Sequence, residues 1–329
     1  MKINPKPLFI LISSIILSSH LSCSQYDGAR IITQYSYPGC IELSNGTTRV
    51  VLEPNMGGRV LVYELKGNNV LYIDPKLNGY IYKPGDIIEP PAGRFDIGPE
   101  FTVPAHPGLW LGKWTAKITG PRQAELISRK DTATGVQLIR KFKLADNGSY
   151  LECTQVIKNI SNKVRNYGHW SRTFVEGGGI SLTPLNPESK YPKGYLIYGP
   201  GSIINYFPEN EDNIRVRDGI LEIIGTPSRP KFVMDGHQGW LAYITKDNQL
   251  LIKKYKVYPD RIYPEIAAST TSIYYFKEEF CEVEPLGPAE TLKPGEEASF
   301  TEHWYLFDYT YPANKTADLN DILKIIEKL

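Results

Sequence analysis

The sequence predicts an all-β protein, a two-sheet sandwich that ends in a short C-terminal helix. Short runs rich in β-branched and aromatic residues recur along the chain, and Asn-Gly or Gly-Gly turns separate them. Helical periodicity occurs clearly only at the C-terminal end. The remaining length, about 300 residues without a linker-like segment, suits one sandwich of many strands better than a small barrel.

Residues 1–23 have the features of an export signal rather than of a folded segment. Lys2 and Lys6 precede an apolar stretch, residues 8–17. This stretch is too short to span a bilayer. A small residue then precedes Cys23, as at the lipidation site of a bacterial lipoprotein. We therefore expect an exported protein anchored through lipidated Cys23, in the periplasm or at the outer membrane of a Gram-negative bacterium. An ordinary secretory signal cleaved nearby is the alternative.

Residues 24–315 are expected to form the β domain. Several runs within residues 40–73 and 124–159 alternate apolar and polar positions, as half-buried antiparallel strands do. Two loop-rich regions, residues 75–109 and 177–208, interrupt this pattern. Loops of this length in a compact domain often form the walls or lid of a binding site, although poorly ordered surface is the alternative.

A helix is expected over residues 316–329. Thr316 has a side chain that can cap its first turn. Leu319, Ile322 and Ile326 then recur at helical spacing and give the segment one apolar face.

Composition and motifs exclude several classes of function. The formal net charge is +1 and no long charge run occurs, so the chain has no nucleic-acid footprint. No glycine-rich phosphate loop lies between a strand and a helix, and Gly-x-Ser-x-Gly is absent. Asp96, Glu100 and His106 are the only metal candidates, and their spacing fits no standard site. We therefore expect neither a metal nor a cofactor.

The three cysteines after the signal region are expected to be small buried hydrophobic residues. Cys40, Cys153 and Cys281 allow at most one internal disulfide, and their spacing matches no zinc motif.

The chain is rich in aromatic side chains, with 22 tyrosines and five tryptophans. A tyrosine combines an apolar ring with a polar hydroxyl, and this combination suits a surface that binds sugars. Sheet surfaces are rich in tyrosine in any case, so composition alone does not decide the function.

Two glutamates stand out in a strand–turn–strand pattern near the C-terminus. Alternation places Glu282 and Glu284 on one face of the strand that begins near residue 280. Each carboxylate disfavours ionisation of the other, so one of the two pKa values should be raised. Such a pair on one face indicates a candidate site.

Five sequence blocks, taken together, resemble the galactose mutarotase-like (aldose 1-epimerase-like) superfamily, in particular a branch of bacterial lipoproteins. They occur in the expected order over most of the chain. The blocks are residues 52–65, residues 106–110, residues 167–173 followed by 177–179, residues 239–243 followed by 258–260, and residues 280–296. The resemblance implies a β-supersandwich whose concave sheet binds a mono- or oligosaccharide.

The resemblance also implies catalytic residues. In sugar epimerases of this superfamily a glutamate accepts the proton of the anomeric hydroxyl, and a histidine protonates the ring oxygen. Glu284, which precedes a proline, matches the glutamate most closely, and Glu282 is its rival. His169 corresponds to the acid, but His-Trp-Ser-Arg-Thr replaces the family's His-x-Tyr-Phe-Asn-Leu. This departure favours glycan binding without catalysis, whereas the paired glutamates favour the epimerase.

Five further residues are expected to bind substrate: Arg59, His106, Trp110, Arg172 and Trp240. The alternatives are a salt bridge for Arg59, a surface loop position for His106 and core packing for the tryptophans. Strand alternation also puts His169 and Arg172 on opposite faces, and the alternative for these two is that only one of the faces meets the cleft.

Three functions follow from these features. The first is an exported sugar epimerase that uses a glutamate base and a histidine acid. The second is a glycan-binding lipoprotein without catalytic activity. The third is a polysaccharide lyase or hydrolase on a related sandwich, with Arg172 neutralising a uronate.

Overall fold

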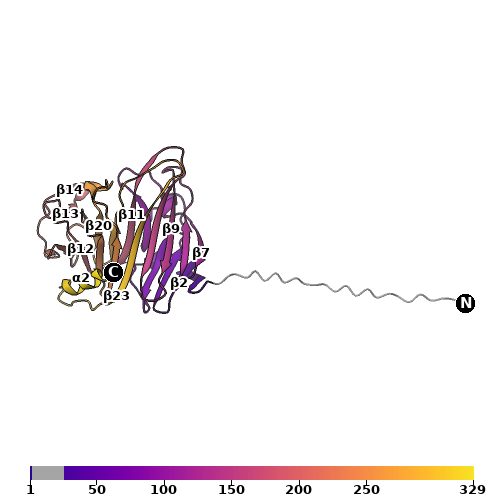
Figure 1. The fold of residues 1–329 in the computed structure, drawn as a ribbon, viewed down its shortest axis with the longest axis horizontal. Coiled ribbons are helices and arrows are strands. Elements are labelled where there is room, and N and C mark those ends of the chain that lie inside the picture. Colours follow the sequence, from indigo (N-terminus) through magenta and orange to yellow (C-terminus); the bar gives the residue numbers. More distant parts are fainter. Residues whose placement is uncertain (2–25) are drawn as a thin grey trace.

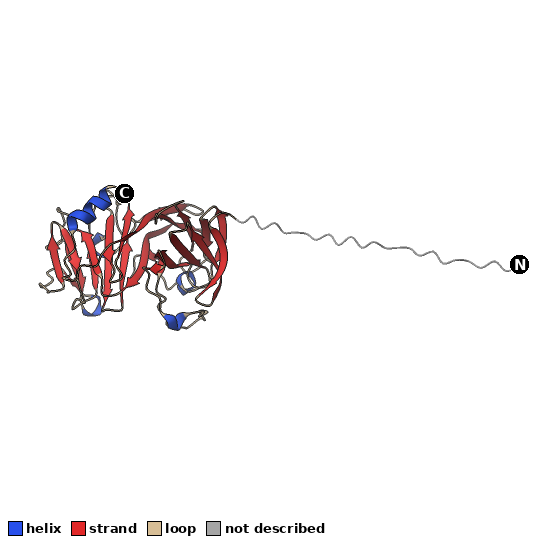
Figure 2. Ribbon diagram, turned by 90° about the horizontal axis from the view of Figure 1, so that it is seen from below, coloured by secondary structure: helices blue, strands red, loops and turns tan. Residues whose placement is uncertain are grey.

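The computed structural model describes Met1 and residues 26–329, and it contains two large β-sheets packed face to face (Figure 1). The predicted lipidation site at Cys23 lies outside the described residues. Strands make up most of the fold, and the helical segments are few and short (Figure 2). Every pairing between named strands is antiparallel, which confirms the predicted two-sheet sandwich.

The larger sheet has 13 strands and carries the N-terminal part of the chain at one edge. β22 pairs with β11, and β5 pairs with β4, beside the main path of the sheet. In spatial order the main path is β1 (Ala29–Gln34), β2 (Tyr37–Ser44), β3 (Thr48–Glu53), β4 (Arg59–Leu65), β6 (Gly93–Gly98), β11 (Arg165–Glu176), β21 (Phe280–Pro285), β20 (Thr271–Phe276), β17 (Lys231–Met234), β13 (Tyr195–Tyr198) and β14 (Ile204–Asn205). The two side strands are β5 (Asn68–Asn69) and β22 (Glu290–Leu292).

The second sheet has 10 strands and brings distant parts of the sequence together. In spatial order they are β15 (Ile214–Arg217), β16 (Ile220–Ile223), β12 (Ile180–Pro184), β18 (Trp240–Ile244), β19 (Gln249–Tyr255), β23 (Glu297–Asp308), β10 (Leu151–Asn159), β9 (Val136–Leu144), β8 (Gln123–Ile127) and β7 (Thr115–Gly120).

The main hydrophobic core fills the space between the two sheets. Phe95 and Ile273 reach it from the larger sheet, and Leu138 and Leu251 reach it from the smaller one. These side chains sit at alternate strand positions, so the opposite face of each strand points away from the core. This alternation sets which side chains the larger sheet presents on its outer face.

The region expected to be a loop over residues 75–109 contains a central strand, β6. All six residues of β6 are buried, because β4 and β11 flank it and both faces of the sheet are covered there. A fully buried strand shows no alternation, and the surrounding prolines hid it further. The same region holds a 3₁₀ turn (Pro75–Leu77) and the short helix α1 (Pro107–Trp110).

The second loop-rich region, residues 177–208, likewise contains strands β12, β13 and β14. Each strand has only two to five residues, which is too few for apolar and polar residues to show a clear alternation in the sequence. Two further 3₁₀ turns occur, at Pro200–Ser202 and Ile266–Ala268.

The C-terminal helix α2 spans Leu319–Glu327 and begins later than expected. Its cap is Asp318, whose carboxylate accepts a hydrogen bond from the backbone N–H of Asp321 at 3.1 Å, and Thr316 lies before the cap. Its apolar face packs on the outer face of the 10-stranded sheet. Within the described part of the chain, no helix has the length and apolarity needed to cross a membrane.

The outer face of the 13-stranded sheet is covered at one end and open at the other. Side chains from the segment of residues 73–92, such as Tyr80 and Ile88, pack over the strands near its N-terminal edge. The open part of the sheet, from β11 to β13, holds the candidate site.

Cys40, Cys153 and Cys281 are free thiols and are buried, as expected.

Candidate functional site

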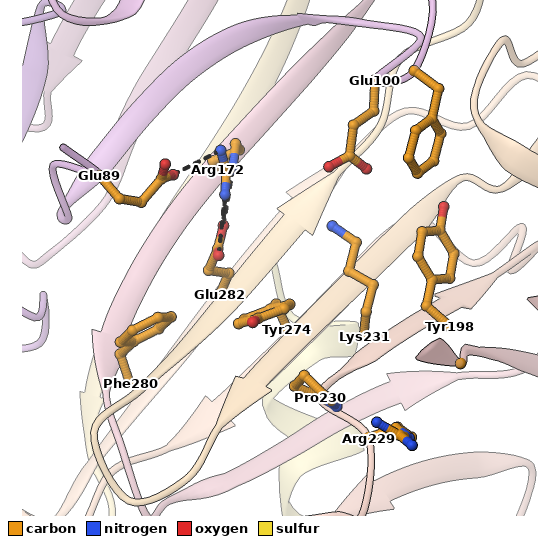
Figure 3. Close-up of a pocket in the computed structure, with 12 residues that line it drawn as sticks. Glu89, Glu100, Arg172, Tyr198, Arg229, Pro230, Lys231, Tyr274, Phe280 and Glu282 are labelled. Atoms are coloured by element: carbon orange, nitrogen blue, oxygen red, sulfur yellow. Dashed lines mark hydrogen bonds and ion pairs between the residues drawn. The ribbon is translucent and has the colours of Figure 1, made fainter. Parts of the chain in front are cut away.

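A cleft of about 490 Å³ lies on the open outer face of the 13-stranded sheet (Figure 3). Four adjacent strands, β11, β21, β20 and β17, supply its floor, and the two expected loop regions supply much of its rim. The floor residues are Arg172, Lys231, Tyr274, Phe280 and Glu282, and the rim residues include Glu89, Glu100, Phe101 and Tyr198.

Strand register explains why these side chains meet. Glu282 of β21 lies opposite Tyr274 of β20 on one side and Phe174 of β11 on the other. Tyr274 lies in turn opposite Lys231 of β17. Residues directly opposite in an antiparallel sheet share a face, so the four side chains form one row across the outer surface.

Arg172 organises the centre of the cleft. Its Nε and Nη2 donate hydrogen bonds to the two carboxylate oxygens of Glu282, at 2.9 and 3.1 Å. Its Nη1 lies 3.0 Å from a carboxylate oxygen of Glu89, and its Nε lies 3.4 Å from Glu284. The guanidinium also lies 5.1 Å from the ring centre of Trp170. These contacts fix its orientation before any ligand binds.

Glu284 lies beneath the cleft and is fully buried. Lys231 Nζ donates to its carboxylate at 2.8 Å, and Trp170 Nε1 donates to it at 3.2 Å. Burial opposes its ionisation, but the positive charges of Lys231 and Arg172 outweigh burial and lower its pKa to about 2. Glu284 is therefore a fixed negative charge that holds Lys231 and Trp170 in place.

Glu282 faces the cleft and is the carboxyl group suited to proton transfer. Burial raises its pKa to about 8 against the opposing charge of Arg172, and the neighbouring carboxylate of Glu284 adds to the rise. A group with this pKa populates both protonation states near neutral pH. The sequence favoured Glu284 over Glu282 as the base, but the structure places Glu282 on the cleft wall and Glu284 below it.

Glu100 and Phe101 form the rim on the side of β13. The backbone N–H of Glu100 donates to the carboxylate of Glu265 at 3.1 Å, which ties the rim to the turn before β20. Burial raises the pKa of Glu265 to about 7, and the nearby charge of Glu100 adds to it. The rim thus depends on one buried carboxyl group.

His106 and Asp96 form a hydrogen-bonded pair that does not line the cleft. His106 Nε2 lies 2.6 Å from Asp96 Oδ1, and His106 Nδ1 lies 2.6 Å from the carbonyl oxygen of Pro104. Burial opposes protonation of His106, but Asp96 outweighs it and raises the histidine pKa. In residues 26–329 no group of three or more His, Cys, Asp or Glu side chains is arranged to hold a metal ion.

His169 lies on the core face of β11. Its ring stacks between Phe95 and Phe300, with ring centres 5.8 and 5.7 Å away, and its Nε2 lies 3.2 Å from the carbonyl oxygen of Ala298. Burial lowers its pKa to about 4. No histidine occurs among the described residues that line the cleft, so the glutamate–histidine pair implied by the resemblance is not assembled there.

The other predicted binding residues also lie away from the cleft, except Arg172. Arg59 is buried and pairs with Glu53 at 3.2 Å, which corresponds to the salt-bridge alternative. Trp110 packs near Arg94, whose guanidinium lies 5.0 Å from its ring. Trp240 belongs to the other sheet, in the cluster covered by α2.

Sequence reasoning missed Lys231, Tyr274 and Glu89. Lys231 begins a four-residue strand, so it gave too little pattern to assign a face. Tyr274 occurs in the run Thr271–Phe276, where two adjacent tyrosines point to opposite faces. Only the pairing of this strand with Glu282 identifies which tyrosine faces outward.

Comparison with known proteins identifies the fold. No family model and no curated protein sequence matches the chain. A galactose mutarotase-like protein from Lactobacillus casei ATCC 334 matches its structure with a TM-score of 0.56 at 11% identity, over 82% of this chain and 100% of the other. A protein provisionally assigned as an aldose 1-epimerase from Escherichia coli K12 gives 0.55 at 10% identity, over 81% and 98%.

A third similar structure is a provisionally assigned mutarotase from Salmonella typhimurium, with a TM-score of 0.52 at 11% identity, over 82% of this chain and 90% of the other. These matches cover most of both chains, so the likeness extends over the whole sandwich. At such low identity it concerns the fold and not the site. The two sheets of this chain therefore form the β-supersandwich of galactose mutarotase-like proteins.

Proposed function

We propose that the protein binds a carbohydrate in the cleft on the outer face of the 13-stranded sheet. The observation that carries this proposal is the position of the Tyr274 ring directly beside the Arg172–Glu282 ion pair. An aromatic ring offers a surface for the C–H face of a sugar. The adjacent charged groups offer donors and acceptors for its hydroxyls.

The charge balance of the cleft favours a neutral sugar. Arg172 and Lys231 already contact carboxylates, Glu282 and Glu284 respectively, within 3.1 Å. A cation that is paired in this way gains little from a carboxylate on the ligand. The ligand carboxylate and the glutamate carboxylate would compete for the same N–H donors. Hydroxyl groups can use the remaining donor and acceptor positions without breaking the ion pairs.

Binding can be tested with a glycan array followed by titration calorimetry on the best ligand. Tyr274→Leu should weaken binding at least about tenfold, equivalent to about 1.4 kcal/mol, because it removes the flat ring at the centre of the cleft. Tyr305→Leu is a matched control, since Tyr305 is also half-buried but lies on the other sheet. Absence of carbohydrate binding, or equal binding by Tyr274→Leu and wild type, would contradict the proposal.

A second candidate function is anomeric epimerisation with Glu282 as the proton-transfer group. The raised pKa of Glu282, together with its position on the cleft wall, favours this candidate. The second proton transfer would need another titratable group of the cleft, and candidates are Lys231 on its floor and Glu100 on its rim. His169 is too deeply buried for that role in this conformation.

Polarimetry separates binding from catalysis. Wild-type protein is added to freshly dissolved α-glucose or α-galactose, and the relaxation of optical rotation is followed over a range of pH values. Epimerase activity should appear as faster relaxation that Glu282→Gln abolishes, while binding persists. If relaxation keeps its buffer rate for a sugar that calorimetry shows to bind, the protein is a non-catalytic glycan-binding protein toward that sugar.

We further propose export and lipid anchoring through Cys23, on the basis of the signal features of residues 1–23. Expression of the full chain in a Gram-negative host, followed by membrane fractionation, tests this. The wild type should partition with the membrane fraction, and Cys23→Ser should not. Equal partitioning of the two proteins would count against lipidation.

A further inference from the structure

We infer that the cleft continues onto an aromatic platform and receives a chain of sugar units rather than a single sugar. The aromatic platform consists of Tyr72, Tyr274, Phe276 and Phe280. Two of its members, Tyr274 and Phe280, line the cleft, and the other two extend beyond it. The inference rests on the proposed function, because it assumes that the cleft binds carbohydrate.

The rings of the platform lie side by side at small angles to one another. Phe280 has ring centres 5.2 Å from Phe276, 5.5 Å from Tyr72 and 6.1 Å from Tyr274. The angles between these ring planes are 30°, 28° and 19°. Since all four side chains are half-buried, the platform presents part of its ring surface to solvent.

Strand register and packing hold the platform in place. Phe276 of β20 lies directly opposite Phe280 of β21, and Tyr274 lies two residues before Phe276 on the same face. The buried ring of Phe174 supports Phe280 from the neighbouring strand, with ring centres 5.1 Å apart and planes tilted by 50°. The backbone N–H of Tyr72 donates to the carbonyl oxygen of Phe174 at 3.0 Å. The surface is therefore preorganised, which lowers the entropic cost of binding.

A second aromatic pair borders the cleft on the opposite side. Phe101 and Tyr198 have ring centres 6.3 Å apart and planes 29° apart, and Phe101 is 52% exposed. From Tyr198 on β13 to Phe280 on β21 there are three strand intervals, or roughly 14 Å at about 4.8 Å each. This span is longer than one pyranose ring, and the Arg172–Glu282 ion pair faces the same cleft.

This arrangement matches the chemistry of an oligosaccharide. One unit would meet the charged groups at the centre of the cleft, and its neighbours would stack on aromatic rings on either side. Lys277 Nζ lies 5.1 Å from the Phe276 ring centre, but its side chain is exposed, and such a contact is weak enough to be displaced. A monosaccharide would leave the outer rings, Phe276 and Tyr72, without a ligand.

Calorimetry with homologous ladders tests the inference. The probes are oligomers of one to six units of glucose, galactose, mannose or N-acetylglucosamine. For the sugar that binds, wild-type affinity should rise with each added unit until the platform is covered, and then level off. Phe276→Leu should bind the monosaccharide as tightly as wild type. Its affinity for the longer oligomers should be about tenfold lower than that of wild type, because leucine fills space but offers no flat ring.

Three further variants make the test specific. Phe276→Tyr should keep the gain with length, and Tyr72→Leu should reduce it. Phe307→Leu, a half-buried phenylalanine on the other sheet, should leave it unchanged. Thermal melts of all variants identify any that fail to fold. If either the Tyr72 or the Phe276 variant fails to fold, the other variant still tests the platform.

The possible results have distinct meanings. Affinity that does not depend on length, or a gain that survives both Phe276→Leu and Tyr72→Leu, would overturn the inference while carbohydrate binding in the cleft stands. A gain lost equally in Phe307→Leu would also overturn it. Absence of binding to any ladder and to the glycan array would remove both the inference and the proposed function.

Discussion

The two faces of β11 carry two charged networks that differ in access to solvent. The cleft network on the outer face consists of Arg172, Lys231, Glu282 and Glu284. On the inner face, a sealed network centres on the ion pair of Lys253 and Glu302, in the core between the sheets. Both networks are built from the same types of residue, so residue type alone does not distinguish them.

The sealed network is closed to solvent. Lys253 Nζ lies 2.7 Å from the carboxylate of Glu302 and donates to the hydroxyls of Ser171 and Thr173 at 3.2 and 3.0 Å. Glu302 also accepts a hydrogen bond from Trp304 Nε1 at 2.9 Å. Neither charged side chain has any exposed surface. The network has no position for a ligand, and its role is structural.

The cleft network, by contrast, is crowded with carboxylates and reaches solvent. Glu282 and Glu284 share the charge of Arg172, and Glu89 approaches the same guanidinium from the rim. Burial raises the pKa of Glu282 most, and the neighbouring carboxylate of Glu284 raises it further. Glu282 can therefore change its protonation state near neutral pH. Access to solvent together with unequal pKa values, rather than charge itself, distinguishes the face that holds the candidate site.

The largest expected effect is on the sealed side. Glu302→Gln keeps the shape of the side chain but leaves Lys253 without its counter-charge in the core. Removing one partner of a buried ion pair typically costs about 3–5 kcal/mol, and we expect a loss in this range. Urea denaturation followed by fluorescence would measure it.

The double variant Lys253→Met with Glu302→Gln serves as the control. It removes both charges, so most of the lost stability should return. Lys66→Met, which breaks an exposed ion pair with Asp308, should change stability far less. If Glu302→Gln were as stable as wild type, the sealed network would not be the structural element described above.

The next effect concerns His169, which lies among aromatic rings on the inner face. Its pKa falls to about 4 through burial, against an ordinary value of 6.5, so the folded protein prefers the neutral ring. Its contribution to stability is complete above pH 6.5 and declines as the pH falls toward 4. At pH 4 the loss should reach about 3 kcal/mol.

His169→Gln tests this because glutamine does not titrate. Urea midpoints of the wild type and the variant, measured from pH 8 to pH 4, should converge as the pH falls. Other groups act on both proteins, so only the difference between them counts. A constant difference across this range would mean that His169 is accessible to solvent, and its candidacy as a catalytic acid would return.

These two faces also explain how much the sequence could reveal. The sheet architecture followed from turn sequences and alternation, because these are local properties. Alternation also separated His169 from Arg172, since neighbours at odd spacing face opposite sides of a strand. The sequence did not reveal which sheet face is open to solvent. Residues 73–92 and α2 determine this, because they cover strands that are distant from them in the sequence.

The candidate site was only partly predictable for the same reason. Arg172 and Glu282 belong to one row because β11 and β21 are neighbours, and these strands lie about a hundred residues apart in the sequence. Lys231 and Tyr274 enter through two further long-range pairings. The family resemblance supplied a histidine partner for the glutamate, but the core face of β11 holds that histidine.

A smaller effect is expected at the cleft, and it should appear in binding more than in stability. Arg172→Met removes the group that orients Glu282 and donates to the ligand, so carbohydrate affinity should fall at least about tenfold, or about 1.4 kcal/mol. Arg215→Met is the matched control, because Arg215 also pairs with a buried glutamate, Glu222, but on the other sheet. Equal loss of binding in both variants would point to general destabilisation instead of a ligand contact.

The last effect tests which carboxyl group of the cleft network carries the proton. The pKa of Glu282 rises to about 8 in the folded protein, so its contribution to stability is complete below its ordinary value of 4.5 and is lost as the pH rises through 8. Glu282→Gln cannot ionise, so its stability relative to wild type should increase between pH 5 and pH 8. The change should be of the same order as that expected for His169, because the pKa of about 8 already includes the opposing charge of Arg172. A constant difference across this range would mean that Arg172 keeps Glu282 ionised throughout, and the mobile proton of the cleft would then belong to another group.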